Sequence, residues 1–166
     1  MKRIVFCCLF AAAVPAMAGA QTPKYGVKVE ADKNVDFAKF KSYTWKKGQP
    51  APLKAVDDQI VSAVERELTG LGMTKAASGT GDVLVTYASL QRSDVNLKAK
   101  KDANGILPQY PVGTLVVDLL DPGTQRQLLR LRLDKPLNAD ASKLESAINS
   151  AVAELFANYP TRQKKR

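Results

Sequence analysis

Residues 114–133 read TLVVDLLDPGTQRQLLRLRL, and this stretch decides the fold class. Its first seven residues are apolar apart from one threonine and one aspartate, and its last five alternate leucine with arginine, the two-residue period of a strand. Between them, residues 121–124 (DPGT) have the composition of a turn, in which proline presets φ at the second position and glycine tolerates a positive φ at the third. The stretch therefore predicts a β-hairpin.

Strand patterns also precede this hairpin. Residues 27–32 alternate apolar and charged side chains, and residues 42–45 (SYTW) suit a pleated surface, so we expect two strands there, the second ending at Lys47-Gly48. Residues 82–88 (DVLVTYA) are apolar on both faces, which is typical of a central strand, and alternation continues over residues 92–98. A polar loop is expected over residues 99–111, which separate this part from the hairpin.

The segment just before the central strand, residues 79–82 (GTGD), superficially resembles a phosphate-binding loop. It precedes a strand instead of a helix, and it lacks the Gly-Lys-Ser or Gly-Lys-Thr ending of such loops. We interpret it as a tight turn.

Two amphipathic helices are predicted. Over residues 53–70, apolar residues recur every three or four positions, and the glycines at 70 and 72 offer a left-handed stop. A second helix is expected to begin at Ser142, because residues 142–145 (SKLE) have the spacing of a capping box, and to end at Pro160.

The order of these elements favours an α+β fold. We expect two layers, a mostly antiparallel sheet with two helices packed on one face. Residues 21–160 are predicted to form this single domain, followed by a basic C-terminal tail at residues 161–166.

The first twenty residues have the features of a secretory signal peptide. Two basic residues precede an apolar run over residues 4–14, and small-residue sites follow at 16–18 and 18–20. The run is too short to span a bilayer, which takes about 20 apolar residues. We expect cleavage before Gln21, or alternatively before Gly19, and no transmembrane span in the mature chain.

Residue types exclude much standard catalytic chemistry. Both cysteines, Cys7 and Cys8, lie inside the predicted signal peptide, and the sequence has no histidine. The expected mature chain therefore has no disulfide, no thiolate nucleophile and no imidazole base. The Gly-x-Ser-x-Gly and Ser-x-x-Lys motifs are also absent from the sequence. The sequence disfavours a serine or cysteine hydrolase and predicts neither a metal site nor a cofactor.

Paired carboxylates remain the one catalytic option, since two acids can serve as acid and base without histidine. Asp118 and Asp121 are the candidates, because Asp118 interrupts an apolar strand. The structural alternative is an ion pair between Asp118 and Arg130 or Arg132 across the hairpin, with Asp121 starting the turn. Adjacent acids at 57–58 are interpreted as a solvated helix face.

Tyr43 and Trp45 lie on the same side of a predicted strand, with Phe37 and Phe40 nearby. Such rings could stack on a sugar, which makes Tyr43, Trp45 and Arg130 candidate ligand-binding residues. The alternative is that the rings belong to the core under the first helix.

Positive charge is unevenly distributed. The chain has 25 Lys and Arg against 16 Asp and Glu, a formal net charge of +9. Four of the basic residues fall in the last five positions: Arg162, Lys164, Lys165 and Arg166. This cluster could contact an anionic lipid or lipopolysaccharide surface, and the simpler interpretation is a solvated end. A second basic cluster, at Lys98, Lys100 and Lys101, is expected in a solvated loop.

These elements, in this order and spacing, resemble the bacterial domain of unknown function 4136 family. The matching segments are VKVE at 27–30, DF at 36–37, YTW at 43–45, LTGLG at 68–72, DVLVTY at 82–87, GTLVVD at 113–118 with the aspartate at 121, and NYP at 158–160. The resemblance implies an exported α+β domain of the envelope, often a lipoprotein, and brings no established activity, cofactor or catalytic residue. This chain departs from relatives in having no suitably placed lipoprotein cysteine, and in having Leu129-Arg130 where relatives tend to have tryptophan followed by arginine.

The sequence therefore favours an exported, noncatalytic domain in the periplasm or peripherally at a membrane, which acts by binding an envelope protein or glycan. One alternative is a carboxylate-based hydrolase of an envelope saccharide. Another is a peripheral adaptor held to anionic membrane surfaces by the basic tail. No nucleic-acid partner is expected.

Overall fold

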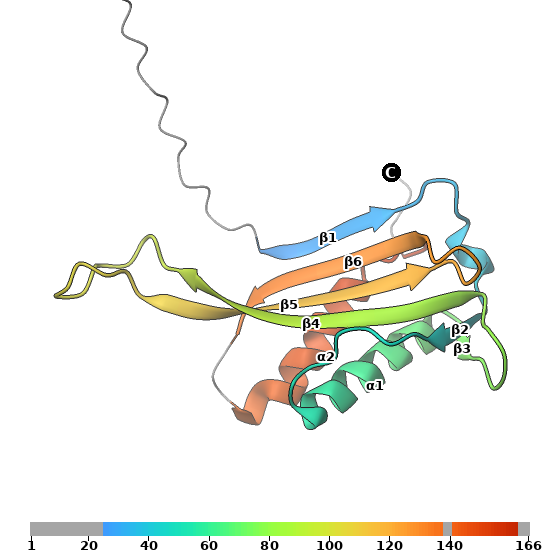
Figure 1. Ribbon diagram of the computed structural model, residues 1–166, viewed down its shortest axis with the longest axis horizontal. Helices are drawn as coiled ribbons and strands as arrows, with labels where there is room; N and C mark the ends of the chain where they lie inside the picture. Colours follow the sequence, from blue (N-terminus) through green and yellow to red (C-terminus); the bar gives the residue numbers. More distant parts are fainter. Residues whose placement is uncertain (1–24, 138–140, 163–166) are drawn as a thin grey trace, which may run out of the picture.

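The computed structural model describes residues 25–137 and 141–162. Its elements are β1 (Gly26–Ala31), η1 (Phe37–Lys39), β2 (Ser42–Trp45), α1 (Lys54–Gly70), β3 (Thr74–Lys75), β4 (Val83–Val95), β5 (Gln109–Leu120), β6 (Gln127–Pro136), η2 (Ala141–Lys143) and α2 (Leu144–Phe156). The strands form a six-stranded sheet in the order β1-β6-β5-β4-β2-β3. Both helices lie on one side of it (Figure 1).

The α+β prediction is confirmed. The pairs β1 with β6, β6 with β5 and β5 with β4 are antiparallel. At the other edge, β2 runs parallel to both β4 and β3, so the sheet is mixed. The two-residue strand β3 has no counterpart in the sequence prediction, because two residues are too few to show a periodicity.

The hairpin of β5 and β6 is confirmed. Leu129, Leu131 and Leu133 face the helices and are almost completely buried. In the turn between the strands, the residue with a positive φ is Gln125, at 61°, and not the permissive Gly123. The connection is longer than a tight two-residue turn, and the Gln125 N–H donates to the carbonyl of Asp121 at 2.9 Å.

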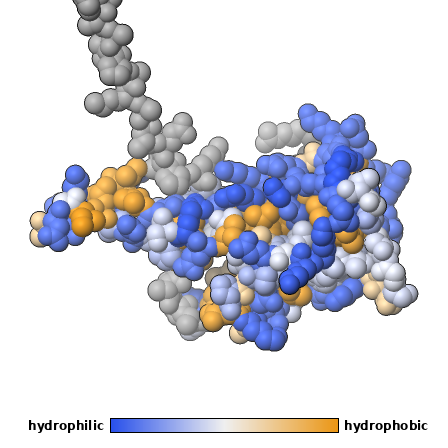
Figure 2. Space-filling view, in the orientation of Figure 1, coloured by the Kyte–Doolittle hydropathy of each residue, from blue (hydrophilic) through white to orange (hydrophobic). Residues whose placement is uncertain are grey.

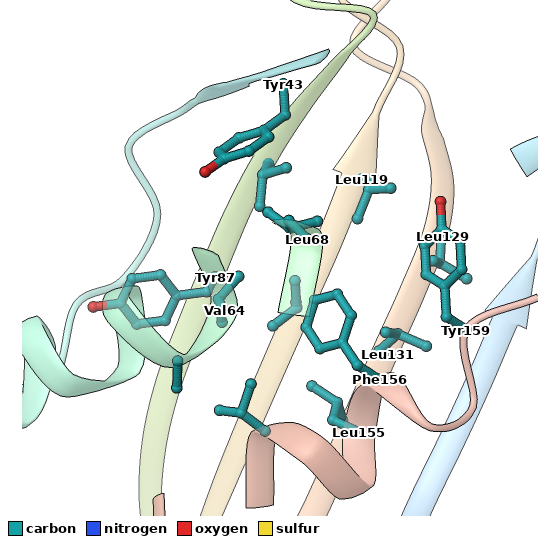
Figure 3. Packing of buried hydrophobic residues seen from close by; sticks show 14 of the residues in the cluster. Tyr43, Val64, Leu68, Tyr87, Leu119, Leu129, Leu131, Leu155, Phe156 and Tyr159 are labelled. Atoms are coloured by element: carbon teal, nitrogen blue, oxygen red, sulfur yellow. The ribbon is translucent and has the colours of Figure 1, made fainter. Parts of the chain in front are cut away.

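The core fills the space between the sheet and the two helices. Val64 and Leu68 of α1 and Leu155 and Phe156 of α2 are fully buried against leucines and valines of β4, β5 and β6. Figure 3 shows these side chains converging between the helices and the strands. The opposite face of the sheet carries no helix in the part of the chain that the structure describes.

Several boundaries differ from the sequence prediction. The patterns at 82–88 and 92–98 belong to one long strand, β4, because residues 83–95 all pair with β5 or β2. The capping-box prediction is wrong, since Ser142 lies in the 3-10 turn η2 and Lys143 occupies the N-cap position of α2. The helix α2 ends at Phe156, before Pro160, and Tyr159 packs into the core from the turn that follows. The predicted stop after α1 is confirmed, with Gly72 at φ 81°.

Candidate functional site

The candidate site is the face of the sheet opposite the helices, which we call the open face. We define it by Arg92 and Asp94 of β4, Thr114 and Asp118 of β5, and Arg130, Arg132 and Asp134 of β6. The two-residue period of a strand explains the set, because these residues alternate along each strand with the buried apolar ones. On β6, for example, the register places Arg130 opposite Asp118 and Asp134 opposite Thr114.

Asp134 is the hub of this face, with only 2% of its surface exposed. Its Oδ1 accepts hydrogen bonds from Arg92 Nη1 (2.7 Å), from the Thr114 hydroxyl (2.6 Å) and from Arg132 Nη2 (3.0 Å). Its Oδ2 accepts from Arg132 Nε at 2.8 Å. The Arg132 guanidinium is the main cause that holds the pKa of Asp134 well below its usual range, against the opposing effect of burial. Asp134 is therefore a permanent anion and a poor proton donor at neutral pH.

Asp94 extends the network toward the N-terminal end of β1. Arg92 Nε donates to Asp94 Oδ1 at 2.9 Å, and the Tyr25 hydroxyl donates to Asp94 Oδ2 at 2.8 Å. The Tyr25 hydroxyl also hydrogen-bonds the hydroxyl of Tyr110. Arg92, followed by Tyr25, lowers the pKa of Asp94. Desolvation, followed by the hydrogen bonds with Tyr110 and Asp94, raises the pKa of Tyr25.

Asp118 and Arg130 form a separate cross-strand pair. Arg130 Nε donates to Asp118 Oδ1 and Arg130 Nη2 donates to Asp118 Oδ2, both at 2.8 Å. This bidentate arrangement is the strongest geometry for an arginine–carboxylate pair. Of the two partners that the sequence allows for Asp118, the structure selects Arg130.

Asp121 lies in the β5–β6 turn and caps it. Its Oδ1 accepts hydrogen bonds from the backbone N–H groups of Thr124 (2.7 Å) and Gly123 (3.1 Å), and from the Thr124 hydroxyl. These contacts, with the Thr124 N–H as the largest cause, lower the pKa of Asp121. Asp118 is held by Arg130 and Asp121 by the turn, so the geometry of these two carboxylates gives no support to the hydrolase alternative.

Tyr43 lies in the core and is only 2% exposed, so it cannot stack on a sugar. Trp45 is half-buried, and its Nε1 donates to Glu65 Oε1 of α1 at 2.7 Å. The Trp45 ring meets Tyr43 and Tyr87 edge to face, at centroid distances of 6.2 and 6.1 Å. Because β2 runs beside β4 under α1, the aromatic residues belong to the packing between helix and sheet.

Arg162 is the one described residue of the predicted basic surface contact. Its Nη1 donates to Glu67 Oε2 at 2.6 Å, near the C-terminal end of α1, where a positive charge is favourable. This pairing ties Arg162 to the folded body. The other three, Lys164, Lys165 and Arg166, lie outside the described residues, as do the predicted signal peptide and both cysteines.

Hollows in the described surface are found elsewhere. One lies at the end of the β4–β5 hairpin, and another lies between α1 and α2. Among the described residues, no group of three histidine, cysteine, aspartate or glutamate side chains could hold a metal ion. No helix in residues 25–137 and 141–162 has the length and apolar character of a membrane span.

Sequence reasoning missed the centre of this face. Asp134, Arg92 and Asp94 were not singled out, although their alternation with apolar neighbours on β4 and β6 was a usable signal. The alternating pattern assigns these residues to the face of the sheet opposite the apolar core. It cannot show that Arg92 and Asp134, which are 42 positions apart, form an ion pair.

Fold and site together define a two-layer α+β domain whose open face carries a fixed array of arginine–aspartate pairs. The chain belongs to the family called Domain of unknown function (DUF4136), whose model matches residues 27–161.

Two solved structures show the same fold at low sequence identity. A PDZ domain protein from Parabacteroides distasonis ATCC 8503 is 18% identical, with a TM-score of 0.57, and the match covers 86% of this chain and 37% of that one. The chain thus spans well under half the length of that protein. PelC from Paraburkholderia phytofirmans, solved as a dodecamer, is 12% identical, with a TM-score of 0.56, and the match covers 86% of this chain and all of PelC. No curated protein sequence matches the chain.

Proposed function

We propose that this chain is an exported, noncatalytic component of the bacterial envelope, and that it acts by binding a partner through the open face of its sheet. Membership of the DUF4136 family and the export signal predicted at residues 1–20 support the envelope assignment. The fold likeness to PelC, which was solved as a dodecamer, is consistent with a protein partner.

The observation that carries the proposal is the fixed arginine array. Arg92, Arg130 and Arg132 are each held by carboxylates, yet their side chains remain 38%, 41% and 41% exposed. Arg130 and Arg132 both use Nε and Nη2 toward aspartate, so the Nη1 group of each is not used in its pair. Side chains that are already ordered lose little entropy on binding, and arginine is suited to planar recognition of polar partners.

A photo-crosslinking experiment in cells tests this surface. A photoreactive residue at Lys28, which lies on β1 directly opposite Arg132, is expected to give an adduct of higher mass. The matched control is the same residue at Ser62, on the exposed side of α1. Arg130→Ala should reduce the adduct about fivefold or more, since truncating a contact in the middle of an interface costs about 1 kcal/mol or more. Equal adducts from both positions, or none from position 28, would refute the proposal.

The hydrolase alternative has its own test. We expect the purified exported protein to release no more soluble fragments from labelled peptidoglycan than buffer does, because Asp118 is committed to Arg130 and Asp121 to the turn. The hydrolase would be established instead if the protein released peptidoglycan fragments, and if Asp118→Asn abolished this release while Asp58→Asn kept it. Asp58 is a suitable control because it lies on α1 and pairs there with the exposed Lys54.

A further inference from the structure

The end of the β4–β5 hairpin projects beyond the rest of the domain. The last residue of β5 that pairs with β6 on this side is Val112, so residues 93–111 form a two-stranded extension, which we call the arm. Figure 1 shows the arm extending from the body at one end of the molecule, away from both helices. The buried core of the described residues includes no side chain from residues 93–111.

Hydrogen bonds hold the end of the arm in a defined conformation. The Asn96 N–H donates to the carbonyl of Pro108 at 2.9 Å, closing the base of the loop. Beyond it, Asp102 Oδ1 accepts from the backbone N–H groups of Asn104 and Ile106, at 2.9 and 2.8 Å. The loop is therefore built to present its side chains outward, and the Asp102 carboxylate is engaged in the turn.

Large apolar side chains are exposed on this end of the arm. Leu97 is 48% exposed, Ile106 is 58% exposed, and Val95 is also exposed. Figure 2 shows hydrophobic residues gathered at the end of the arm, beside hydrophilic ones. Apolar surface that is fixed in water and far from the core marks a contact with another apolar phase or molecule.

The neighbouring charges identify that phase. Lys98, Lys100 and Lys101 lie in the same loop, all exposed, and the loop's one acid is Asp102. An excess of lysine around apolar side chains is the composition of segments that lie in the headgroup region of anionic membranes. The lysines complement lipid phosphates, while leucine and isoleucine reach the boundary with the acyl chains.

We propose that the tip of the arm, residues 96–108, inserts shallowly into the surface of an anionic lipid membrane, with Leu97 and Ile106 as the apolar anchors. Lys98, Lys100 and Lys101 contact the headgroup phosphates. This contact is separate from the open face, so the domain can be placed at a membrane while its arginine array binds a partner.

Fluorescence with lipid vesicles tests the insertion. The protein is purified after export, with Cys7→Ser and Cys8→Ser, and carries an environment-sensitive dye on Leu97→Cys or, as a control, on Leu53→Cys, another exposed leucine, near the start of α1. We expect a blue shift and an intensity gain at position 97 with vesicles that contain phosphatidylglycerol. We expect neither change with pure phosphatidylcholine vesicles, and neither at position 53.

Unlabelled variants then separate the arm from other membrane contacts in a vesicle co-sedimentation assay. Replacing all three lysines with glutamate should abolish binding, and Leu97→Ser with Ile106→Ser should weaken it about tenfold or more, since burying each apolar side chain contributes to partitioning. A chain ending at Arg162 should still bind. Three outcomes would overturn the proposal. Vesicle binding could be lost when residues 163–166 are removed but kept in the arm variants, or the dye could shift equally at positions 97 and 53. The third outcome is that the arm variants change only the oligomeric state.

Discussion

At the scale of single residues, Asp134 shows how a charge can be placed inside a sheet. The Arg92 guanidinium and the Thr114 hydroxyl donate to its Oδ1, and the Arg132 guanidinium donates to its Oδ2. Both oxygens of the buried carboxylate therefore accept hydrogen bonds. A buried charge of this kind costs several kcal/mol unless it is paired and hydrogen-bonded. Its value to the protein is that it fixes Arg92 and Arg132 in place.

Asp134→Asn should lower the free energy of unfolding by about 2 kcal/mol at pH 7, because it leaves two arginines without their shared counter-charge. The pKa of Asp134 is lowered in the folded state, so its contribution is present above the unfolded pKa of about 3.9 and is lost as pH falls through the lower folded value. The gap between wild type and variant should therefore narrow from pH 5 to pH 2 in urea titrations. Asp58→Asn, in an exposed pair, should change stability by less than about 0.5 kcal/mol.

Tyr159 is the opposite case, a buried polar group without a hydrogen-bond partner among the described residues. Burial raises the pKa of its hydroxyl to about 12. A raised pKa means that the neutral form is favoured, so stability is present below the unfolded pKa of about 10 and is lost as pH rises toward 12.

Tyr159→Phe should be neutral or stabilising by up to about 1 kcal/mol at pH 7, since it removes an unpaired hydroxyl and keeps the ring. The ring contacts with Phe37 and Phe156 are retained. Denaturant melts between pH 9 and pH 12 should show a smaller loss of stability in the variant than in wild type. A variant that loses 2 kcal/mol or more at pH 7 would show that the hydroxyl has a partner after all.

At the scale of elements, β2 is attached by a close backbone contact that a sequence pattern does not reveal. Gly81, just before β4, lies so near β2 that an added Cβ would be 2.7 Å from the Cα of Tyr43. The Gly81 N–H also donates to the Thr44 hydroxyl at 2.9 Å. The glycine-rich segment that resembles a phosphate loop thus serves strand packing.

Gly81→Ala should destabilise the domain by about 2 kcal/mol or more, because the clash involves backbone atoms that cannot move without displacing β2. Gly123→Ala is the control, as its nearest neighbour would be 3.6 Å away. Thermal melts of both variants check the prediction. Equal melting temperatures for the two would show that β2 can shift to make room.

At the scale of the whole molecule, the tip of the arm, residues 96–108, is energetically distinct from the body. The buried core consists of residues from the helices and from the sheet beneath them, and it contains no residue of this tip. The tip is therefore not required for folding of the body.

Replacing residues 96–108 with a two-residue Asn-Gly turn should leave the free energy of unfolding within about 1 kcal/mol of wild type, because no core contact is lost and a shorter loop costs less entropy to close. Chemical denaturation measures this directly. A large loss of stability would mean that the arm supports the sheet, and its exposed leucine and isoleucine would then need a structural explanation.

The sequence by itself determined the elements that follow from local periodicity: the β5–β6 hairpin, the two helices, and the separation of leucines from arginines on β6. It also indicated the family, through the order of its segments. The predictions of these elements depend on residues close together in the sequence, the range over which alternation and helical spacing carry information, whereas the family follows from the order of segments along the chain.

Only the tertiary structure decided which distant residues meet. It placed β2 parallel to β4 and β3, buried Tyr43 in the core, and joined Arg92 to Asp134 and Arg162 to Glu67. A periodic pattern assigns a side chain to a face but does not name its partner across the sheet, because strand order and register depend on the packing of the entire core. The arginine array and the exposed arm are consequences of that packing.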